Sequence, residues 1–414
     1  MDSRIRQCAN DQWRGFMVNV CVSGLGVVAP NGSSLDDFWA SLVTATSAFS
    51  PARSVLPSRI LAAELGIDAL KDVPIARPLM CDRSALIAIA AASRALDDAR
   101  LTPGSYDPTR VAVVIGNGAG GQTTTEQQYQ LLYRQGHGRI SPLAVPKIMG
   151  SSTASWVSIA FGLQGPAFVL SSACASGTHA IGVAAQLVQS GVVDVAVTGG
   201  VEACLTVGTL RAWEAMGILA TDTCRPFARG RAGLVLAEGA GLIVLESEAH
   251  ARARKAPMRA RYAGYGSSAD AGDLTKPSAD GMARAMRAAL AASQLLPREI
   301  DYVNAHGTGT KTNDRVETEA LHAVFGRETV PLVSSTKSVT GHALGAAGGL
   351  EAVASVLTLQ HHLVPPTANF DEADPECALD CVPNIARPHA VRAVMSNSFA
   401  FGGLNASVVF VEAR

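Results

Sequence analysis

The stretch Ser171–His179, which reads SSACASGTH, decides how the rest of the chain is organised. The apolar residues 166–170 before it predict a short buried strand. After it, apolar residues between 181 and 188 recur at helical spacing until Gly191, a residue type that commonly follows a helix end. Cys174 is therefore expected at a strand-to-helix turn, in the first turn of the helix.

A cysteine at this position has the physical setting of a nucleophile. The free N–H groups and the positive dipole end of a helix favour a thiolate, and the small neighbours of Cys174 leave room for a substrate. The competing interpretation is a buried structural cysteine, because free cysteine is among the most buried residue types. This stretch alone does not decide between a nucleophile and a structural cysteine.

Composition limits the broad class of the protein. The chain has 414 residues, and its 34 basic and 35 acidic side chains give a net charge of −1, so no global field favours nucleic acid or a membrane surface. The eight cysteines form no C-x-x-C pair and no zinc set, which favours reduced thiols and a cytoplasmic location. We expect residues 1–16 to form a disordered leader rather than a signal peptide. The most apolar predicted helix, near residues 86–92, is too short to cross a membrane.

Glycines follow several predicted strands in the first half. The strand at 18–22 precedes an expected Gly-rich turn at 24–26, and the strand at 111–115 precedes a G-x-G-x-x-G pattern at 116–121. A dinucleotide fingerprint needs a helix that opens at once and an acidic residue about 20 positions later. We predict neither here, so we interpret these glycines as a tight turn beside a packed site.

The second half repeats the outline of the first. A helix at 282–293 precedes a strand at 300–303, and strands are also expected at 331–334 and 391–395, with a helix of small residues at 343–359 between them. Alternating strands and helices predict a mainly parallel sheet covered by helices. We expect one compact α/β unit of two similar halves, residues 17–255 and 256–414.

Three further chemistry-bearing residues follow predicted strands. His306, Lys337 and His342 each lie among Gly, Ser and Thr, where an open α/β sheet places its ligands. Together with Cys174 they form a candidate catalytic set. His179, one turn beyond Cys174, is expected to be structural. The basic run at 252–261 is expected to be a solvated helix end, with a docking patch for an acidic partner as the alternative.

From about Val18 to its end, the chain resembles the β-ketoacyl-[acyl-carrier-protein] synthases, which are condensing enzymes of the thiolase superfamily. The motifs that carry the resemblance are residues 172–177, 304–310, 335–342 and 397–403. The resemblance implies a thiolase-like fold with a layered αβαβα core, and the elongating, KAS II-like type with a Cys-His-His set. Residues 212–216 and 222–227 are also similar to nodulation protein E-type ketosynthases, which handle unusual unsaturated acyl chains.

The resemblance implies a 3-oxoacyl-ACP synthase. Cys174 would hold an acyl group, and malonyl-ACP would lose carbon dioxide and attack it in a decarboxylative Claisen condensation. By resemblance, His306 and His342 stabilise the enolate, and Lys337 orders the two histidines electrostatically. The backbone N–H groups of Cys174 and Phe401 would form the oxyanion hole.

The family also supplies roles for residues around the catalytic set. Substrate-binding positions are implied for Thr308, Thr310, Phe399, Ala400 and Phe401, of which the two threonines contact the phosphopantetheine arm. Glu351 and Asn397 are implied as structural residues and, with Asn304 and Ser396, could hold a structural cation. No catalytic metal or other cofactor is expected. Ala400 stands where the family usually has glycine, and Ala228, Leu234 and Leu404 also depart from the common pattern, which leaves the acyl preference open.

Two other functions compete with the condensing enzyme. A non-catalytic chain-length factor would need the nucleophile replaced, and Cys174 is present. A coenzyme A thiolase would need a second catalytic cysteine, and Cys377 and Cys381 lie in a loop unlike that motif. The expected partners are acyl carrier protein and a second copy in a homodimer, with a heterodimer with a chain-length factor as the alternative. Fatty-acid synthesis and a specialised polyene, polyketide or nodulation-type pathway both remain open.

Overall fold

The computed structural model describes residues 18–55, 59–136 and 138–413. The predicted leader, residues 1–16, lies outside these described residues. Within them, no helix is both long and apolar enough to cross a membrane.

Ten strands form one continuous sheet. Their order is β11-β10-β14-β15-β9-β1-β8-β6-β4-β5. The sheet divides into two five-stranded halves that meet where β1 pairs with β9, and each half has three parallel strands followed by two antiparallel ones. The prediction of a mainly parallel sheet is therefore wrong, since the sheet is mixed. The bounds are β1 (Val20–Val28), β4 (Val111–Gly116), β5 (Ala167–Leu170), β6 (Val195–Glu202), β8 (Gly239–Ser247), β9 (Ala260–Ala269), β10 (Tyr302–Asn304), β11 (Leu332–Ser334), β14 (Ala393–Ala400) and β15 (Leu404–Val411).

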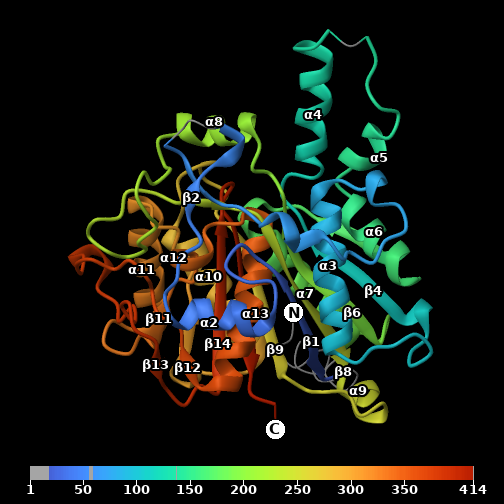
Figure 1. Cartoon of the computed structure of the whole chain (residues 1–414). Helices are drawn as coiled ribbons and strands as arrows, with labels where there is room; N and C mark the ends of the chain where they lie inside the picture. The colour runs from blue at the N-terminus through green and yellow to red at the C-terminus, as the bar shows by residue number, and fades with distance from the viewer. Residues whose placement is uncertain (1–17, 56–58, 137, 414) are drawn as a thin grey trace, which may run out of the picture.

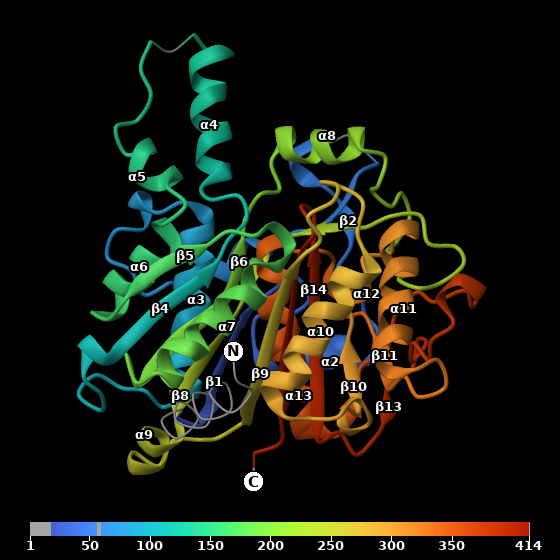
Figure 2. The same cartoon turned by 180° about the vertical axis from the view of Figure 1, so that it is seen from behind.

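Helices lie on both sides of this sheet and between its halves (Figures 1 and 2). Helices α3 and α6 cover the outer face of the first half, α10 covers that of the second with α11 packed beside it, and α7 and α13 pack between the halves. The layered αβαβα core is thereby confirmed. The helices are α2 (Leu35–Val43), α3 (Arg83–Asp98), α4 (Gln122–Tyr133), α5 (Ala144–Ile148), α6 (Ser152–Phe161), α7 (Ser176–Gln189), α8 (Val207–Ala215), α9 (Glu248–Ala253), α10 (Ala279–Ser293), α11 (Lys311–Phe325), α12 (Lys337–Thr340) and α13 (Ala347–His361).

Short strands form two small additional sheets. One joins β2 (Ser50–Pro51), β3 (Leu61–Ala63) and β7 (Leu236–Ala237), and the other joins β12 (Leu363–Val364) and β13 (Arg387–Pro388). The boundary predicted at residues 255/256 stays a prediction, because the two halves share one sheet and one central helix layer.

The central helix α13 is buried from Ala347 through Leu359, as expected for a helix that is apolar on every side. Its glycines let two neighbouring elements approach the backbone. A Cβ on Gly348 would lie 2.1 Å from the Thr178 hydroxyl of α7, and one on Gly349 would lie 2.2 Å from the Gly241 carbonyl of β8. The small residues predicted at 343–359 therefore serve close packing in the middle layer.

Glycines inside a strand explain one wrong boundary. The expected turn at Gly24–Gly26 is part of β1. A Cβ on Gly26 would lie 2.0 Å from the Ala91 carbonyl, so this glycine lets α3 approach the strand. Likewise, β6 continues through Gly199 and Gly200 to Glu202. These glycines permit close helix–strand and strand–strand contact rather than chain reversal.

Three further expectations need correction. Strand β5 was predicted to be buried, but it is an edge strand whose Ala167 is exposed and whose other residues are half-buried. A helix, α4, does open at Gln122 directly after the G-x-G-x-x-G pattern, contrary to the prediction. A Cβ on Gly121 would lie 2.2 Å from the Lys147 carbonyl, so this glycine still permits close packing of the two segments. Strands β9 and β15 were not predicted.

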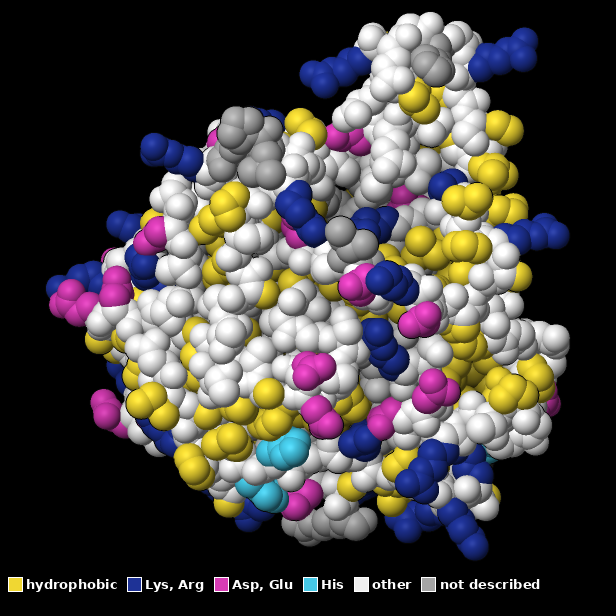
Figure 3. All heavy atoms as spheres, viewed as in Figure 1, with side chains coloured by type: hydrophobic (Ala, Val, Ile, Leu, Met, Phe, Trp, Pro, Cys, Tyr) yellow, Lys and Arg dark blue, Asp and Glu magenta, His cyan; other side chains and the backbone are white. Residues whose placement is uncertain are grey.

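Helices α4 and α5 form an arm that projects from the body of the molecule (Figures 1 and 2). The arm exposes Tyr129, Tyr133, Val145 and Met149. Hydrophobic side chains are visible along it in Figure 3. An exposed apolar group of this kind marks an interaction surface.

Candidate active site

Cys174 lies in a sharp turn between β5 and α7. The turn is the short 3-10 helix Ala173–Ala175, and Ala173 has φ of +49°, in the left-handed region. The Ser176 hydroxyl closes the turn, accepting a hydrogen bond from the Ser172 N–H at 2.9 Å and donating one to the Ala173 carbonyl at 2.6 Å. A left-handed non-glycine residue persists only where its surroundings hold it, often at functional sites.

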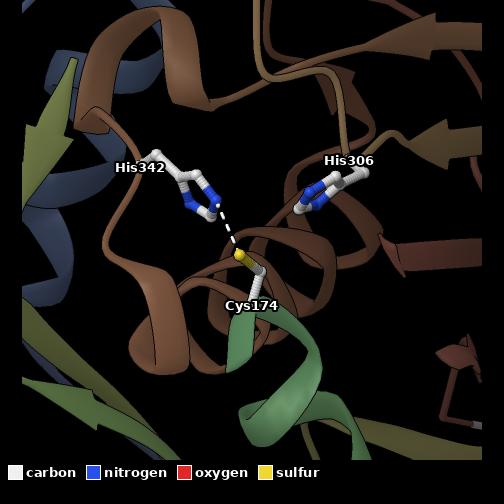
Figure 4. Close-up of side chains that lie close together, drawn as sticks. All are labelled: Cys174, His306 and His342. Carbon is white, nitrogen blue, oxygen red and sulfur yellow. Dashed lines mark hydrogen bonds between the residues drawn. The ribbon is translucent and has the colours of Figure 1, made fainter. Parts of the chain in front are cut away.

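Both predicted histidines lie beside this thiol (Figure 4). The His342 Nε2 atom is 3.1 Å from the Cys174 Sγ atom. The His306 ring lies edge-on to the His342 ring, with 5.3 Å between centroids. One ligand atom from each of the three side chains lies within 4.8 Å of the others, so all three can reach one thioester group.

A buried carboxylate fixes the backbone of the loop that follows β10. Glu317 accepts the backbone N–H groups of His306 and Gly307 at 2.8 and 2.7 Å. The His342 backbone is fixed in the same way by strand-like bonds, since its N–H donates to the Val235 carbonyl at 2.7 Å and its carbonyl accepts from the Ala237 N–H at 3.0 Å. The two rings therefore project from rigid backbone.

Lys337 lies behind the two imidazoles and is almost fully buried. Its Nζ donates to the His306 carbonyl at 2.6 Å and forms an ion pair with Glu351 on α13. Burial lowers the pKa of His306 and of His342 well below the usual value, and the positive charge of Lys337 lowers both pKa values further. Both imidazoles are therefore neutral at pH 7.

The hydrogen bonding of the rings assigns their proton. Among the described residues, the Nδ1 atoms of His306 and His342 have no hydrogen-bond partner and are buried. Leaving a buried N–H unpaired costs more than leaving a lone pair unpaired, so the proton belongs on Nε2. His342 then donates its Nε2–H toward Cys174 Sγ, and both rings present N–H donors to the site.

The protonation of Cys174 differs from the sequence prediction. Burial raises the pKa of Cys174 to about 12, and the nearby Lys337 charge acts in the opposite direction. The helix end therefore does not by itself produce a resting thiolate, because the loss of water around the sulfur is the larger effect. The Lys337 charge lowers this pKa, and a hydrogen bond from the His342 N–H can stabilise the thiolate form of Cys174.

A cavity of about 650 Å³ opens onto these three side chains. Its walls include every predicted catalytic and substrate-binding residue except Lys337: Cys174, His306, Thr308, Thr310, His342, Phe399, Ala400 and Phe401. The hydroxyl groups of Thr308 and Thr310 are 2.9 Å apart, and both residues line the cavity.

The cavity wall also contains residues that sequence analysis did not single out as site residues. They include Trp213 of α8 and Lys276 in the loop after β9. Trp213 stacks on Phe401, with 5.8 Å between ring centroids and 16° between ring planes. Nothing in the spacing of residues 207–215 distinguishes an aromatic residue that lines a cavity from one that packs in a core.

Unpaired buried polar atoms occur on three residues near the loops of His306 and Lys337: Asn304 and Ser396 are register partners on β10 and β14, and Glu351 forms the ion pair with Lys337. Among the described residues, both polar side-chain atoms of Asn304, Glu351 Oε2 and Ser396 Oγ have no hydrogen-bond partner. An oxygen-rich set of this kind fits a hard cation. The Asn397 side chain is occupied elsewhere, since its Oδ1 accepts from the Ser407 hydroxyl at 2.7 Å and its Nδ2 donates to Met286 Sδ at 3.4 Å.

Other candidates from the sequence have structural partners. His179 bonds through Nδ1 to the Ala175 carbonyl at 3.0 Å, one turn back on its helix. In the basic run, Arg254, Arg259 and Arg261 form ion pairs with Glu246, Asp98 and Glu248 respectively. Arg252 also pairs with Glu248, so most of the run is paired within the chain, and a docking patch there stays a prediction.

Comparison with known proteins identifies the family. Models for the beta-ketoacyl synthase N-terminal and C-terminal domains match residues 17–251 and 259–371. The chain is 42% identical to nodulation protein E of Rhizobium sp. (strain N33), over 94% of this chain and 98% of that protein. It is 39% identical to 3-oxoacyl-[acyl-carrier-protein] synthase 2 of Staphylococcus aureus (strain MRSA252), over 95% and 98%.

A solved structure agrees with this result. AntDE:AntF is a type II PKS acyl-carrier protein in complex with its ketosynthase bound to the hexaketide. A chain of that complex superimposes on this one with a TM-score of 0.87 and 31% identity, covering 96% of this chain and 100% of that chain. The chain described here belongs to the beta-ketoacyl synthase family and is an acyltransferase-type ketosynthase.

Proposed function

We propose that this 3-oxoacyl-ACP synthase uses Cys174, His306 and His342 as its catalytic residues. The observation that carries the proposal is the contact between a buried thiol and a neutral imidazole, 3.1 Å apart, with the second imidazole beside them. The non-catalytic chain-length factor is not favoured, because the nucleophile and its hydrogen-bond donor are both in place.

In the first half-reaction, the Cys174 sulfur attacks the acyl thioester of acyl carrier protein. A Cys174 S–C bond forms, the thioester C–S bond breaks, and the thiol proton ends on the sulfur of the carrier. The His342 N–H and the Lys337 charge support the developing thiolate. The backbone N–H groups of Cys174 and Phe401 would hold the tetrahedral oxyanion.

In the second half-reaction, the malonyl thioester loses carbon dioxide and becomes an enolate. The N–H groups of His306 and His342 would donate to the enolate oxygen, which is possible because both rings are neutral donors. The enolate carbon then attacks the acyl carbonyl on Cys174, a C–C bond forms, and the Cys174 sulfur leaves and takes up a proton.

Substrate contacts follow from the cavity. Thr308 and Thr310 would bond the amide groups of the pantetheine arm, and Phe399, Ala400 and Phe401 would contact the acyl end of the substrate. Glu351 fixes Lys337 by its ion pair, and Asn397 supports β14 through its bond to Ser407. No metal takes part in these steps.

Intact-protein mass spectrometry with a panel of acyl-carrier proteins tests the proposal. The wild-type chain should gain one acyl group and Cys174→Ala should gain none. Cys21→Ala, which removes another buried thiol far from the cavity, should load normally. The chain that loads best would separate ordinary fatty-acid elongation from a specialised unsaturated pathway. Equal loading of Cys174→Ala would refute the assignment.

We propose acyl carrier protein and a second copy of the chain as partners, the first by analogy with the similar complex of a type II PKS acyl-carrier protein with its ketosynthase. Strand β5 leaves one sheet edge open, and the α4–α5 arm exposes apolar side chains. We propose a homodimer that covers both. Sedimentation should show a dimer that Phe168→Lys in β5 dissociates, while Ile385→Lys, an exposed control, does not. A monomer that dimerises only with a chain-length factor would overturn the homodimer.

Two smaller proposals complete the assignment. Asn304, Glu351 and Ser396 would hold a structural cation, which predicts that added sodium, potassium or magnesium raises the melting temperature of the wild type but not of Ser396→Ala. We also propose a cytoplasmic location, because the seven described cysteines are all free thiols, as a reducing compartment would keep them. Fractionation of cells would test it.

A further inference from the structure

Glu202, at the carboxyl end of β6, is a fully buried carboxylate that the proposed reaction steps do not use. Its Oε2 atom accepts the Gly118 N–H at 2.9 Å and the Gly345 N–H at 3.1 Å, and its Oε1 atom accepts the Ala119 N–H at 3.3 Å. Among the described residues, no cationic side chain forms an ion pair with it. Backbone N–H groups therefore hold this carboxylate.

The three donors belong to two separate segments. Two of them follow β4, and the third lies in the 3-10 turn Leu344–Ala346, which begins two residues after His342. A Cβ on Gly118 or Gly345 would lie 2.7 or 2.8 Å from the Oε2 atom, so a side chain at either position would displace the carboxylate. Glu202 therefore joins the loop after β4 to the turn that follows His342.

The same turn packs against the segment that carries the nucleophile. The ideal Cβ position of Gly177, in the first turn of α7, is 3.1 Å from the Gly345 carbonyl. His342, just before the turn, contacts the Cys174 sulfur at 3.1 Å (Figure 4). Glu202 therefore fixes a turn that lies against both the Cys174 segment and the ring that donates to the thiol.

A charge on Glu202 also acts on the thiol itself. Burial is the main reason that the pKa of Cys174 is raised, the Lys337 charge lowers it, and the Glu202 charge raises it further. Burial also raises the pKa of Glu202 to about 7, although its backbone N–H bonds lower it. The carboxyl group therefore changes charge near neutral pH.

The titratable groups around Glu202 and the thiol come from several elements. The loop at 117–120 and the turn at 344–346 contain none. The neighbouring segments contribute Cys204 after β6, Glu238 before β8 and, around the thiol, His306, His342, Lys337 and Glu351. Burial raises the pKa values of both thiols and lowers those of both histidines, so none of these four groups changes charge near neutral pH.

We propose that Glu202 is a positioning residue that, from its site behind the turn after His342, opposes formation of the Cys174 thiolate when it is charged. Raising the pH favours the thiolate of any cysteine, but here it also charges Glu202, which disfavours that thiolate. The reactivity of Cys174 therefore rises less steeply near neutral pH than that of an isolated thiol. The inference rests on the proposed nucleophile, but its test needs no turnover.

The test measures the rate at which N-ethylmaleimide alkylates Cys174, read by peptide mass spectrometry so that Cys204 is scored separately. The wild-type rate should rise about tenfold per pH unit, except near pH 7, where roughly three- to tenfold of the gain is lost. Glu202→Gln has no charge, and its amide oxygen can still accept the Gly118 and Gly345 N–H groups. This variant should match wild type at about pH 6 and react roughly three- to tenfold faster at about pH 8.5.

A matched control removes the charge of another buried glutamate in the same sheet. Glu246 on β8 is also fully buried, pairs with Arg254 and is the register partner of Val195, at the opposite end of β6. Glu246→Gln should follow the wild-type pH profile. Glu317 is the alternative origin of an inflection, because burial raises its pKa to about 7 as well and it bonds the His306 backbone.

Two results would overturn the inference. One is a wild-type rate that rises about tenfold per pH unit throughout, which decides the matter even if Glu202→Gln does not fold. The other is an inflection that persists in folded Glu202→Gln, since it would then belong to Glu317. If Cys174→Ala loads acyl groups as well as wild type while the alkylation profiles are as expected, the proposed function fails and the effect of Glu202 on the thiol stands.

Discussion

The contact between His342 and the thiol predicts that the two histidines proposed as catalytic are not equivalent. The hydrogen bond to Cys174 Sγ, at 3.1 Å, comes from His342. The His306 ring lies beside the His342 ring, edge-on to it, with 5.3 Å between the ring centroids. Replacing each with alanine should therefore affect the two half-reactions differently.

The magnitudes follow from the number of donors lost. A hydrogen bond is worth about 1 kcal/mol, so His342→Ala should slow acylation of Cys174 by about fivefold, and His306→Ala should leave it nearly unchanged. Removing one donor from a developing oxyanion costs about 10²–10³ in rate, so both variants should slow malonyl decarboxylation by that factor.

Mass spectrometry can follow both steps on the same protein. Acylation is read as the mass gain of the enzyme in a rapid-quench series, and decarboxylation as conversion of malonyl-ACP to acetyl-ACP. His179→Ala, whose Nδ1 bonds to its own helix, serves as a histidine control with normal decarboxylation. Equal effects of His306→Ala and His342→Ala on acylation would refute the argument from the sulfur contact.

Three other predictions concern stability. Lys337→Met leaves Glu351 buried without its ion pair and should lower the free energy of unfolding by about 3–5 kcal/mol. The double variant Lys337→Met/Glu351→Gln should recover stability, because it removes the unpaired charge as well. Denaturant melts that show no recovery would count against the importance of this ion pair. Burial raises the pKa of Glu202 from 4.5 to about 7, so the folded state binds the extra proton and stability falls as pH rises through this window. Glu202→Gln should therefore gain stability relative to wild type between about pH 5 and about pH 8, and a pH-independent difference would contradict this. Gly26→Ala should destabilise by at least about 1–3 kcal/mol, because its Cβ would lie 2.0 Å from the Ala91 carbonyl; an unchanged melting temperature would show that the helix can move away.

The sequence could predict which side chains the fold brings together, Cys174, His306 and His342, because each follows a strand and lies among small residues. It could not show that His342, rather than His306, contacts a thiol 168 positions earlier, since that distance is set by how the two halves pack. The sequence also could not show whether the pKa of Cys174 is raised or lowered in the folded protein. A helix end lowers a thiol pKa and burial raises it, and only the burial of Cys174 in the folded chain shows which effect is larger.

Errors in the predicted fold have equally physical causes. Glycine marks either a turn or a close approach, and only the position of α3 shows that Gly24 and Gly26 serve the second purpose. An apolar pattern does not show where in a sheet a strand lies, so β5 was predicted to be buried although it lies at an edge. Trp213 was missed because its partner, Phe401, is close only in the folded chain.

The strand order has a consequence for the synthesis of this protein. Strands β14 and β15, residues 393–411, insert between β10 and β9, which were made before them. A chain growing on the ribosome therefore carries Cys174 long before the sheet that positions His306 can close. The thiol should be catalytically silent in any nascent chain stalled before residue 393, and it should become active only when these last two strands have been translated and inserted.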